Sequence, residues 1–298
     1  MTTKYNPGSK PSLACEITST SVIAGRVADK GGVVEACASR ELAVGSLVPD
    51  LVENNLRERG AVLDAIRDTL GRVGGRSRDI IAVLPDAAVR VVLLDFETLP
   101  AKSEDAENVV RFRLKKSLPF DVDKARVSYH AQTSGNGIRV IAAVALLSVI
   151  EDYESTFREA GYNPGVVLPS MLAALGAAST DRPTMVVKVD DRTVSLTILD
   201  KQQLLLFRTI ENPYGAGITG EQLAEEIYPS VVFFQDTYQL NLEQIFVSGL
   251  TDADGAAPAL QSQTGAQVAD LVSGSQLGAG TGLIPRWKLG GVTGALLA

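Results

Sequence analysis

The stretch LACEITSTSVIAGRV (residues 13–27) reads as a strand, a turn of hydroxyl-bearing residues and a second strand. A second stretch, TMVVKVDDRTVSLTILD (184–200), repeats this pattern, with its polar turn at residues 190–192. In both places a third strand-like run follows, and a segment with helical periodicity comes later. The sequence therefore predicts two α/β lobes that open with the same three consecutive strands.

The composition favours a folded protein and argues against several functions. The chain has 298 residues, of which 45% are hydrophobic and 21% charged, enough for two lobes with packed cores. Its formal net charge is −7, whereas binding nucleic acid needs a concentrated basic face. The longest apolar run, residues 140–150, is shorter than the about 20 residues that span a bilayer. We therefore expect a cytoplasmic protein with no nucleic-acid partner and no direct membrane insertion.

Periodicity places further elements along the chain. Apolar residues spaced by three, four and seven predict a helix within residues 51–73. Residues 79–161 read as strand, strand, helix, strand, strand, helix. A helix near residues 220–240 contains Pro229, which should kink or divide it. Residues 251–282 are rich in small and polar residues, and we expect loops there around one helix or strand.

The order of several segments resembles a known family. VVRFRLKKSLPFDVDKARVSYH (109–130) is similar to the signature stretch of the type IV pilus assembly protein PilM family, within the actin-like ATPase superfamily. REAGYNPGVVLPSMLAAL (158–175), SVVFFQDTYQLNLEQIFVSGL (230–250) and LGGVTGALLA (289–298) resemble later parts of that family in the same order. The resemblance covers most of the chain, from about Leu13 to Ala298.

This resemblance implies an actin-like (RNase H-like) two-lobed α/β fold with a 1C-type βαββ insert. Subdomain 1A would comprise residues 11–87 and 162–180, subdomain 1C residues 88–161, and subdomain 2A residues 181–298. The family has a further subdomain, 2B, inserted in the second lobe. Here residues 208–234 run almost directly into the next helix, so we expect 2B to be missing.

The positions that match the superfamily's nucleotide loops are degenerate. Thr18 stands where the first loop has glycine, and Lys188 stands where the second loop has a carboxylate. An ammonium group has no lone pair with which to hold Mg²⁺. The candidate nucleotide-loop positions are Glu16, Thr18, Ser19, Thr20, Asp190, Asp191, Arg192 and Gly249. We expect no cofactor, no metal and no catalytic residue, which would make the chain a degenerate ATPase; ATP with Mg²⁺ is the alternative.

A cationic helix end lies beside an apolar turn. The candidate partner-binding residues there are Arg111, Arg113, Lys115, Lys116, Pro119 and Phe120. The four cations can equally be a complement to the helix dipole. In the PilM family, the cytoplasmic tail of the bitopic membrane protein PilN binds a groove between 1A and 1C. The resemblance thus implies a partner-binding surface near this helix.

The function that the resemblance implies is a non-catalytic cytoplasmic scaffold of a type IV pilus or related secretion machine. It would be peripheral at the inner membrane through a PilN-like partner, and it could self-associate. One alternative is an active actin-like ATPase or sugar-kinase-like phosphotransferase, for which Glu16, Asp190 and Asp191 are the candidate residues. Another is a divisome protein like FtsA, but residues 290–298 lack the charges and length of an amphipathic membrane helix.

Overall fold

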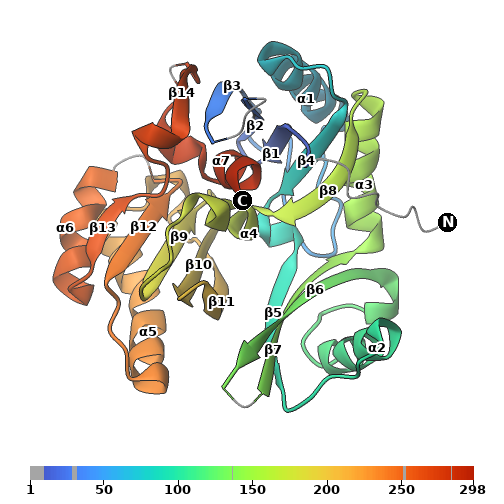
Figure 1. The fold of residues 1–298 in the computed structure, drawn as a ribbon. Helices are drawn as coiled ribbons and strands as arrows, with labels where there is room; N and C mark the ends of the chain where they lie inside the picture. Colours follow the sequence, from blue (N-terminus) through green and yellow to red (C-terminus); the bar gives the residue numbers. More distant parts are fainter. Residues whose placement is uncertain (1–9, 29–31, 136, 251–252, 283) are drawn as a thin grey trace.

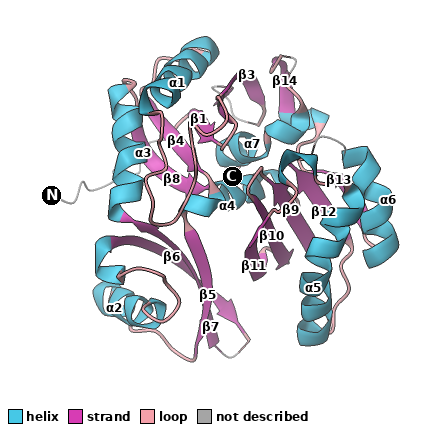
Figure 2. Ribbon diagram, turned by 180° about the vertical axis from the view of Figure 1, so that it is seen from behind, coloured by secondary structure: helices cyan, strands magenta, loops and turns pink. Residues whose placement is uncertain are grey.

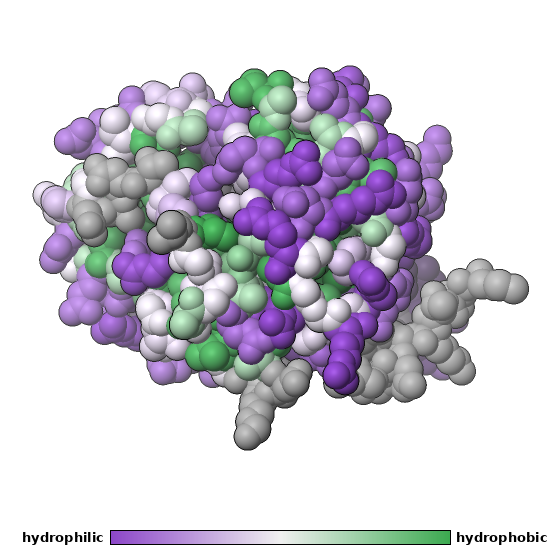
Figure 3. All heavy atoms as spheres, turned by 90° about the horizontal axis from the view of Figure 1, so that it is seen from above, coloured by the Kyte–Doolittle hydropathy of each residue, from purple (hydrophilic) through white to green (hydrophobic). Residues whose placement is uncertain are grey.

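The computed structural model describes residues 10–28, 32–135, 137–250, 253–282 and 284–298 (Figure 1). These residues form two α/β lobes and a smaller three-stranded insert below the first lobe in the view of Figure 1. Seen from above, the surface is mainly hydrophilic, and the hydrophobic residues drawn in colour gather in small groups (Figure 3).

Lobe 1 contains a six-stranded sheet with helices on both faces. In sheet order its strands are β14 (Leu277–Gly280), β3 (Val34–Glu41), β2 (Ser21–Val27), β1 (Leu13–Ile17), β4 (Asp79–Leu84) and β8 (Asn163–Pro169). Helices α1 (Arg59–Val73) and α3 (Leu147–Glu159) pack on one face, and α4 (Ser170–Ala174) and α7 (Gly290–Leu297) on the other. The alternation of β1 follows from this, because Cys15 and Ile17 face α1 while Ala14 and Glu16 face α7.

Lobe 2 repeats the arrangement around a five-stranded sheet. In sheet order its strands are β11 (Gln203–Glu211), β10 (Thr193–Asp200), β9 (Thr184–Val189), β12 (Gln244–Ser248) and β13 (Gln267–Asp270). Helices α5 (Gly220–Tyr238) and α6 (Ala253–Thr264) cover its outer face (Figure 2). In both lobes the first strand pairs antiparallel with the second and parallel with a later strand, β4 or β12. The internal repeat that the sequence indicates is therefore confirmed.

The insert is a sheet of order β5-β7-β6 with one helix. Its elements are β5 (Arg90–Phe96), α2 (Ser103–Leu114), β6 (Ala125–Ser134) and β7 (Gly137–Leu146). Val110 and Leu114 of α2 pack on Val140, Ala142 and Val144 of β7. Helix α2 thus covers one face of this sheet, and residues of the other face turn towards lobe 1.

Three expectations differ from the structure in detail. Helix α1 begins at Arg59 rather than near residue 51, because the side chains of Asp50 and Asn54 accept hydrogen bonds from backbone N–H groups and hold a turn there. Helix α5 is not divided at Pro229, because it runs as one helix with buried residues on both sides of the proline; a kink there stays a prediction. Residues 251–282 contribute both α6 and β13 to lobe 2, and β14 to lobe 1.

The position of β14 bears on the proposed division into subdomains. β14 lies within the range 181–298 assigned to 2A, yet it pairs with β3 in the sheet of lobe 1. The division into 1A, 1C and 2A stays a prediction. Residues 212–219, which join β11 to α5, leave no space for an inserted subdomain, as expected for a chain without 2B.

Helix α7 lies where the two lobes meet, and glycines allow its close approach. A Cβ atom on Gly294 would lie 2.2 Å from the carbonyl oxygen of Ala173, and one on Gly290 would lie 2.4 Å from Oγ of Ser248. All residues from Gly290 to Leu296 are buried. The glycines of this C-terminal helix therefore set how closely lobe 1, α4 and lobe 2 pack.

We predict opposite effects of Gly→Ala substitution in two helices. Gly294→Ala should lower the free energy of unfolding by about 1–3 kcal/mol, because its Cβ overlaps Ala173. Gly71→Ala in α1, where a Cβ meets no atom within 4 Å, should raise it by roughly 0.5–1 kcal/mol. Urea unfolding measures both changes. Equal effects of the two substitutions would contradict the close packing of α7.

Candidate functional site

A row of polar side chains crosses the inner face of the lobe 2 sheet. Ser248, Lys188, Ser195 and Thr209 occupy paired positions on β12, β9, β10 and β11. The alternate residues of these strands belong to the core beneath α5 and α6, so the polar row turns towards lobe 1. The two lobes therefore meet across polar groups in a region that would hold nucleotide in an actin-like protein.

A buried ion pair joins the lobes at this row. The Nζ atom of Lys188 lies 2.9 Å from Oε1 of Glu16, and the two side chains are 9% and 0% exposed. The Ser170 hydroxyl, on the first turn of α4, donates a hydrogen bond of 2.5 Å to the same oxygen. A Cβ atom on Gly291 would lie 2.5 Å from the Glu16 carboxylate. The carboxylate is thus enclosed by Lys188, Ser170 and α7.

A second buried carboxyl, Asp86, lies close to the pair. It accepts a hydrogen bond of 2.8 Å from the backbone N–H of Met171 and so caps α4. Burial raises the pKa of Asp86 to about 6, although the charge of Lys188 opposes the shift. Burial alone would lower the pKa of Lys188, but the charges of Glu16, Asp86 and Asp190 raise it overall. Lys188 therefore remains an ammonium ion among carboxylates.

The first candidate nucleotide loop closes on itself. The Thr18 hydroxyl accepts hydrogen bonds from the backbone N–H groups of Ser21, at 3.0 Å, and Thr20, at 3.4 Å. Backbone N–H groups of this kind cradle phosphate in working loops. Here a side chain occupies them. Thr20 is exposed at the tip, and the Ser19 side chain turns to lobe 2.

The second loop is closed in the same way and is joined to the first. The Ser19 hydroxyl donates a hydrogen bond of 2.9 Å to Oδ1 of Asp190. The backbone N–H of Arg192 reaches the same oxygen at 3.4 Å, while the side chains of Asp191 and Arg192 are exposed. Gly249 has a φ of +84°, and a Cβ there would lie 1.8 Å from the carbonyl oxygen of Val189, so packing alone requires glycine at this position.

The arrangement supplies its own cation and its own loop contacts. Lys188 neutralises Glu16 where a carboxylate would otherwise attract a metal. Among the described residues, no group of three or more His, Cys, Asp and Glu is arranged to hold a metal ion. The other carboxylate oxygen of Glu16, Oε2, is buried and has no hydrogen-bond partner among the described residues. The site therefore contains an internal ion pair that joins the two lobes.

The structure brings together three of the sequence-predicted positions, Glu16, Ser19 and Asp190, and adds residues that the sequence analysis missed. The missed residues are Asp86, Ser170, Ser195 and Gly291. Asp86 and Ser170 could have been found from the sequence, because each follows a Leu-Pro pair at the end of a strand, in Leu84-Pro85-Asp86 and Leu168-Pro169-Ser170. β4 and β8 are parallel neighbours, so their ends open at one edge of the sheet.

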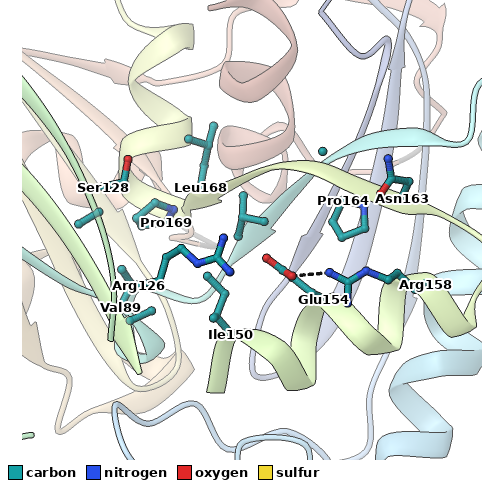
Figure 4. Close-up of a pocket in the computed structure, with 14 residues that line it drawn as sticks. Val89, Arg126, Ser128, Ile150, Glu154, Arg158, Asn163, Pro164, Leu168 and Pro169 are labelled. Atoms are coloured by element: carbon teal, nitrogen blue, oxygen red, sulfur yellow. Dashed lines mark hydrogen bonds and ion pairs between the residues drawn. The ribbon is translucent and has the colours of Figure 1, made fainter. Parts of the chain in front are cut away.

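A cavity of about 570 Å³ lies between lobe 1 and the insert (Figure 4). Its walls come from β8, α3, β6, β7 and the residue that precedes β5. The lining residues are Val89, Arg126, Ser128, Ala143, Ala145, Ile150, Glu154, Arg158, Asn163, Pro164, Gly165, Val167, Leu168 and Pro169. β8 is the last strand of the lobe 1 sheet, and β6 is the last strand of the insert sheet. Among the described residues β8 has no neighbouring strand on its outer side, and the lining residues of β6 and β7 belong to the face of the insert sheet opposite α2, so the cavity lies between the free edge of β8 and that face.

The predicted partner-binding residues lie on the α2 side of the insert, and most have partners within it. Arg111 forms an ion pair with Glu107 and donates to the carbonyl of Val122, and the Arg113 guanidinium lies 5.4 Å from the centroid of the Phe96 ring. Lys115 lies 3.6 Å from Asp123. Phe120 is half-buried against the insert core, and Lys116 and Pro119 are exposed. Partner binding by these residues stays a prediction.

The tip of the insert is attached to lobe 2. The Gln132 amide donates to the carbonyl of Leu204 at 2.8 Å and accepts from its N–H at 3.2 Å. Arg139 donates to the Tyr238 hydroxyl at 2.8 Å and forms an ion pair with Asp95. Lobe 1, the insert and lobe 2 therefore make contact in a closed ring.

Comparison with known structures identifies the fold. A chain of the PilM–PilN type IV pilus biogenesis complex superposes with a TM-score of 0.77 at 17% identity, covering 96% of both chains. The ethanolamine utilization protein EutJ from Carboxydothermus hydrogenoformans gives a TM-score of 0.54 at 12% identity, covering 98% of this chain and 91% of that one. A Bacteroides thetaiotaomicron protein of unknown function with an actin-like ATPase fold gives 0.50 at 12% identity, covering 86% and 88%.

These likenesses confirm the expected actin-like α/β fold and the resemblance to PilM at the level of the fold. No protein-family model matches the sequence, and no curated protein matches it. Within the described residues, no helix has the length and apolar character needed to cross a membrane.

The buried ion pair predicts strong coupling between its members. Lys188→Met should lower the free energy of unfolding by about 3–5 kcal/mol, because it leaves the Glu16 carboxylate buried without a counter-charge. Adding Glu16→Gln should recover much of that loss. Chemical denaturation of both single variants and the double variant measures the coupling. Additive losses would contradict a direct interaction.

The raised pKa of Asp86 predicts that the free energy of unfolding depends on pH. Its pKa in the folded protein is about 6, above the roughly 3.9 of an unfolded chain, so the folded state binds more protons between these values. Its stabilising contribution is complete below pH ~4 and is lost as pH rises through about 6. Compared with Asp86→Asn, the wild type should gain roughly 1 kcal/mol in unfolding free energy between pH 7 and pH 5. A difference that stays constant across this range would contradict the assignment.

Proposed function

We propose that the chain is a non-catalytic scaffold that binds the cytoplasmic peptide of a PilN-like bitopic inner-membrane protein in the cavity between lobe 1 and the insert. The chain would be peripheral at the inner membrane through that partner. It would take part in assembling a type IV pilus or a related secretion machine. The fold likeness to the PilM–PilN complex supports this class of function.

The observation that carries the proposal is the cavity between the free edge of β8 and the face of the insert sheet opposite α2. A strand edge offers backbone N–H and C=O groups to an extended peptide, and alternate pockets receive its side chains. On β8, residues 164 and 169 are prolines without N–H groups, and the N–H of Asn163 already donates to the carbonyl of Arg78, so any further donors lie within residues 165–168. A short extended segment would therefore fit this edge better than a long strand.

The walls of the cavity indicate the chemistry of the peptide. Its floor includes Val89, Ile150, Val167 and Leu168, which favour apolar side chains. Arg126 reaches into the cavity from β6, facing α3, where Glu154 and Arg158 form an ion pair (Figure 4). We infer a mainly apolar peptide with polar groups at one side.

The contacts in the buried cleft between the lobes support the proposal that the chain is not catalytic. Lys188 takes the place of a metal-binding carboxylate, and the Thr18 and Asp190 side chains occupy the loop donors. Hydrolysis of ATP needs a site that orients Mg²⁺, phosphate and a water molecule. The proposal therefore places the function outside the cleft between the two lobes.

Two tryptophan substitutions on β6 test the proposed cavity. Ser128 and His130 are both exposed on the same face of this strand, but only Ser128 lines the cavity. Ser128→Trp should fill it and reduce co-purification of a single-span membrane protein with the tagged chain by at least about tenfold. His130→Trp is the matched control and should retain the partner. Full retention by Ser128→Trp would overturn the proposed binding site.

A further inference from the structure

A basic surface with one projecting aromatic ring lies at the end of α2. Phe112 is 68% exposed. Arg113, Lys115, Lys116 and Lys124 lie around the same end of the insert, and all four are exposed. We call these five residues the basic patch.

The charge of this region is opposite to that of the whole chain. Residues 111–124 carry five cationic and two acidic side chains, and Arg111 is paired with Glu107, which leaves four cations, two acids and a local charge of +2, whereas the whole chain carries −7. Lys115 lies 3.6 Å from Asp123, but both side chains are more than half exposed, so this pair is weak. The Arg113 guanidinium lies over the Phe96 ring, but its side chain is exposed, so all four cations of the basic patch can still contact an anionic partner.

The shape of the basic patch distinguishes it from the cavity. Helix α2 lies on the outer side of the insert sheet (Figure 1), and the cavity is lined by residues of the opposite face. A helix end with a projecting ring is convex, so it provides no groove for an extended peptide. A phenylalanine ring at a membrane surface inserts at the boundary between headgroups and acyl chains, and lysine and arginine bind the anionic headgroups.

We propose that the basic patch is a direct contact surface for the anionic headgroups of a membrane, with the Phe112 ring inserted at the boundary between headgroups and acyl chains. This contact is peripheral and reversible, since one ring and a few cations give only weak attachment. It goes beyond attachment through a membrane-protein partner, because the lipid surface itself is recognised. It also does not depend on what occupies the cavity.

Vesicle co-sedimentation of the full chain tests the proposal. In low-salt buffer the wild type should bind vesicles of equal parts phosphatidylcholine and phosphatidylglycerol, and it should not bind pure phosphatidylcholine. The triple variant Arg113→Gln, Lys115→Gln, Lys116→Gln should bind about a hundredfold more weakly, because each cation near an anionic surface contributes roughly a fivefold factor. High salt should abolish binding.

A charge-matched control separates the basic patch from net charge. The variant Arg57→Gln, Arg76→Gln, Lys201→Gln removes three exposed cations elsewhere and should bind as the wild type does. Phe112→Trp in a Trp287→Phe background should show a blue shift of its emission only with phosphatidylglycerol vesicles.

Three results would overturn the proposal. They are failure of the wild type to prefer phosphatidylglycerol vesicles, equal loss of binding in the two triple variants, and binding to poly-glutamate in place of vesicles. The last would assign the basic patch to an acidic polypeptide.

Discussion

The ion pair between Glu16 and Lys188 is the constraint on which the arrangement of the two lobes depends. Both side chains are removed from water, so each requires the other to remain charged. Ser170 brings α4 to the same carboxylate, and Gly291 lets α7 pack directly on it. One buried contact therefore fixes the positions of β1, β9, α4 and α7 together.

The same region of the structure supports the proposal that the chain is not catalytic. In lobe 1 the Thr18 hydroxyl satisfies the turn that would hold phosphate, and Ser19 bonds directly to Asp190 of lobe 2. Gln132 and Arg139 of the insert add a second attachment to lobe 2. These contacts are satisfied within the chain, and both proposed binding surfaces therefore lie outside the cleft, on the insert and along β8.

The parts of the fold that could be predicted from the sequence are those set by local pattern. The two opening hairpins follow from alternating hydrophobic residues around polar turns. The start of α1 could not be predicted, since it depends on side-chain hydrogen bonds of Asp50 and Asn54 that compete with the helix. β14 has only the residues LGAG, and its pairing with β3 depends on how lobe 2 returns the chain to lobe 1.

The candidate site could also be predicted from the sequence only in part. Lys188 could be recognised as incompatible with Mg²⁺ from its chemistry alone. That it pairs with Glu16 could not, because the two residues belong to different lobes. The central claim is that this pair replaces a nucleotide, and calorimetric titration with Mg-ATP, together with a phosphate-release assay, tests it most directly. The account predicts no saturable binding and no phosphate release, whereas sub-micromolar affinity, or turnover that Glu16→Ala abolishes, would contradict it.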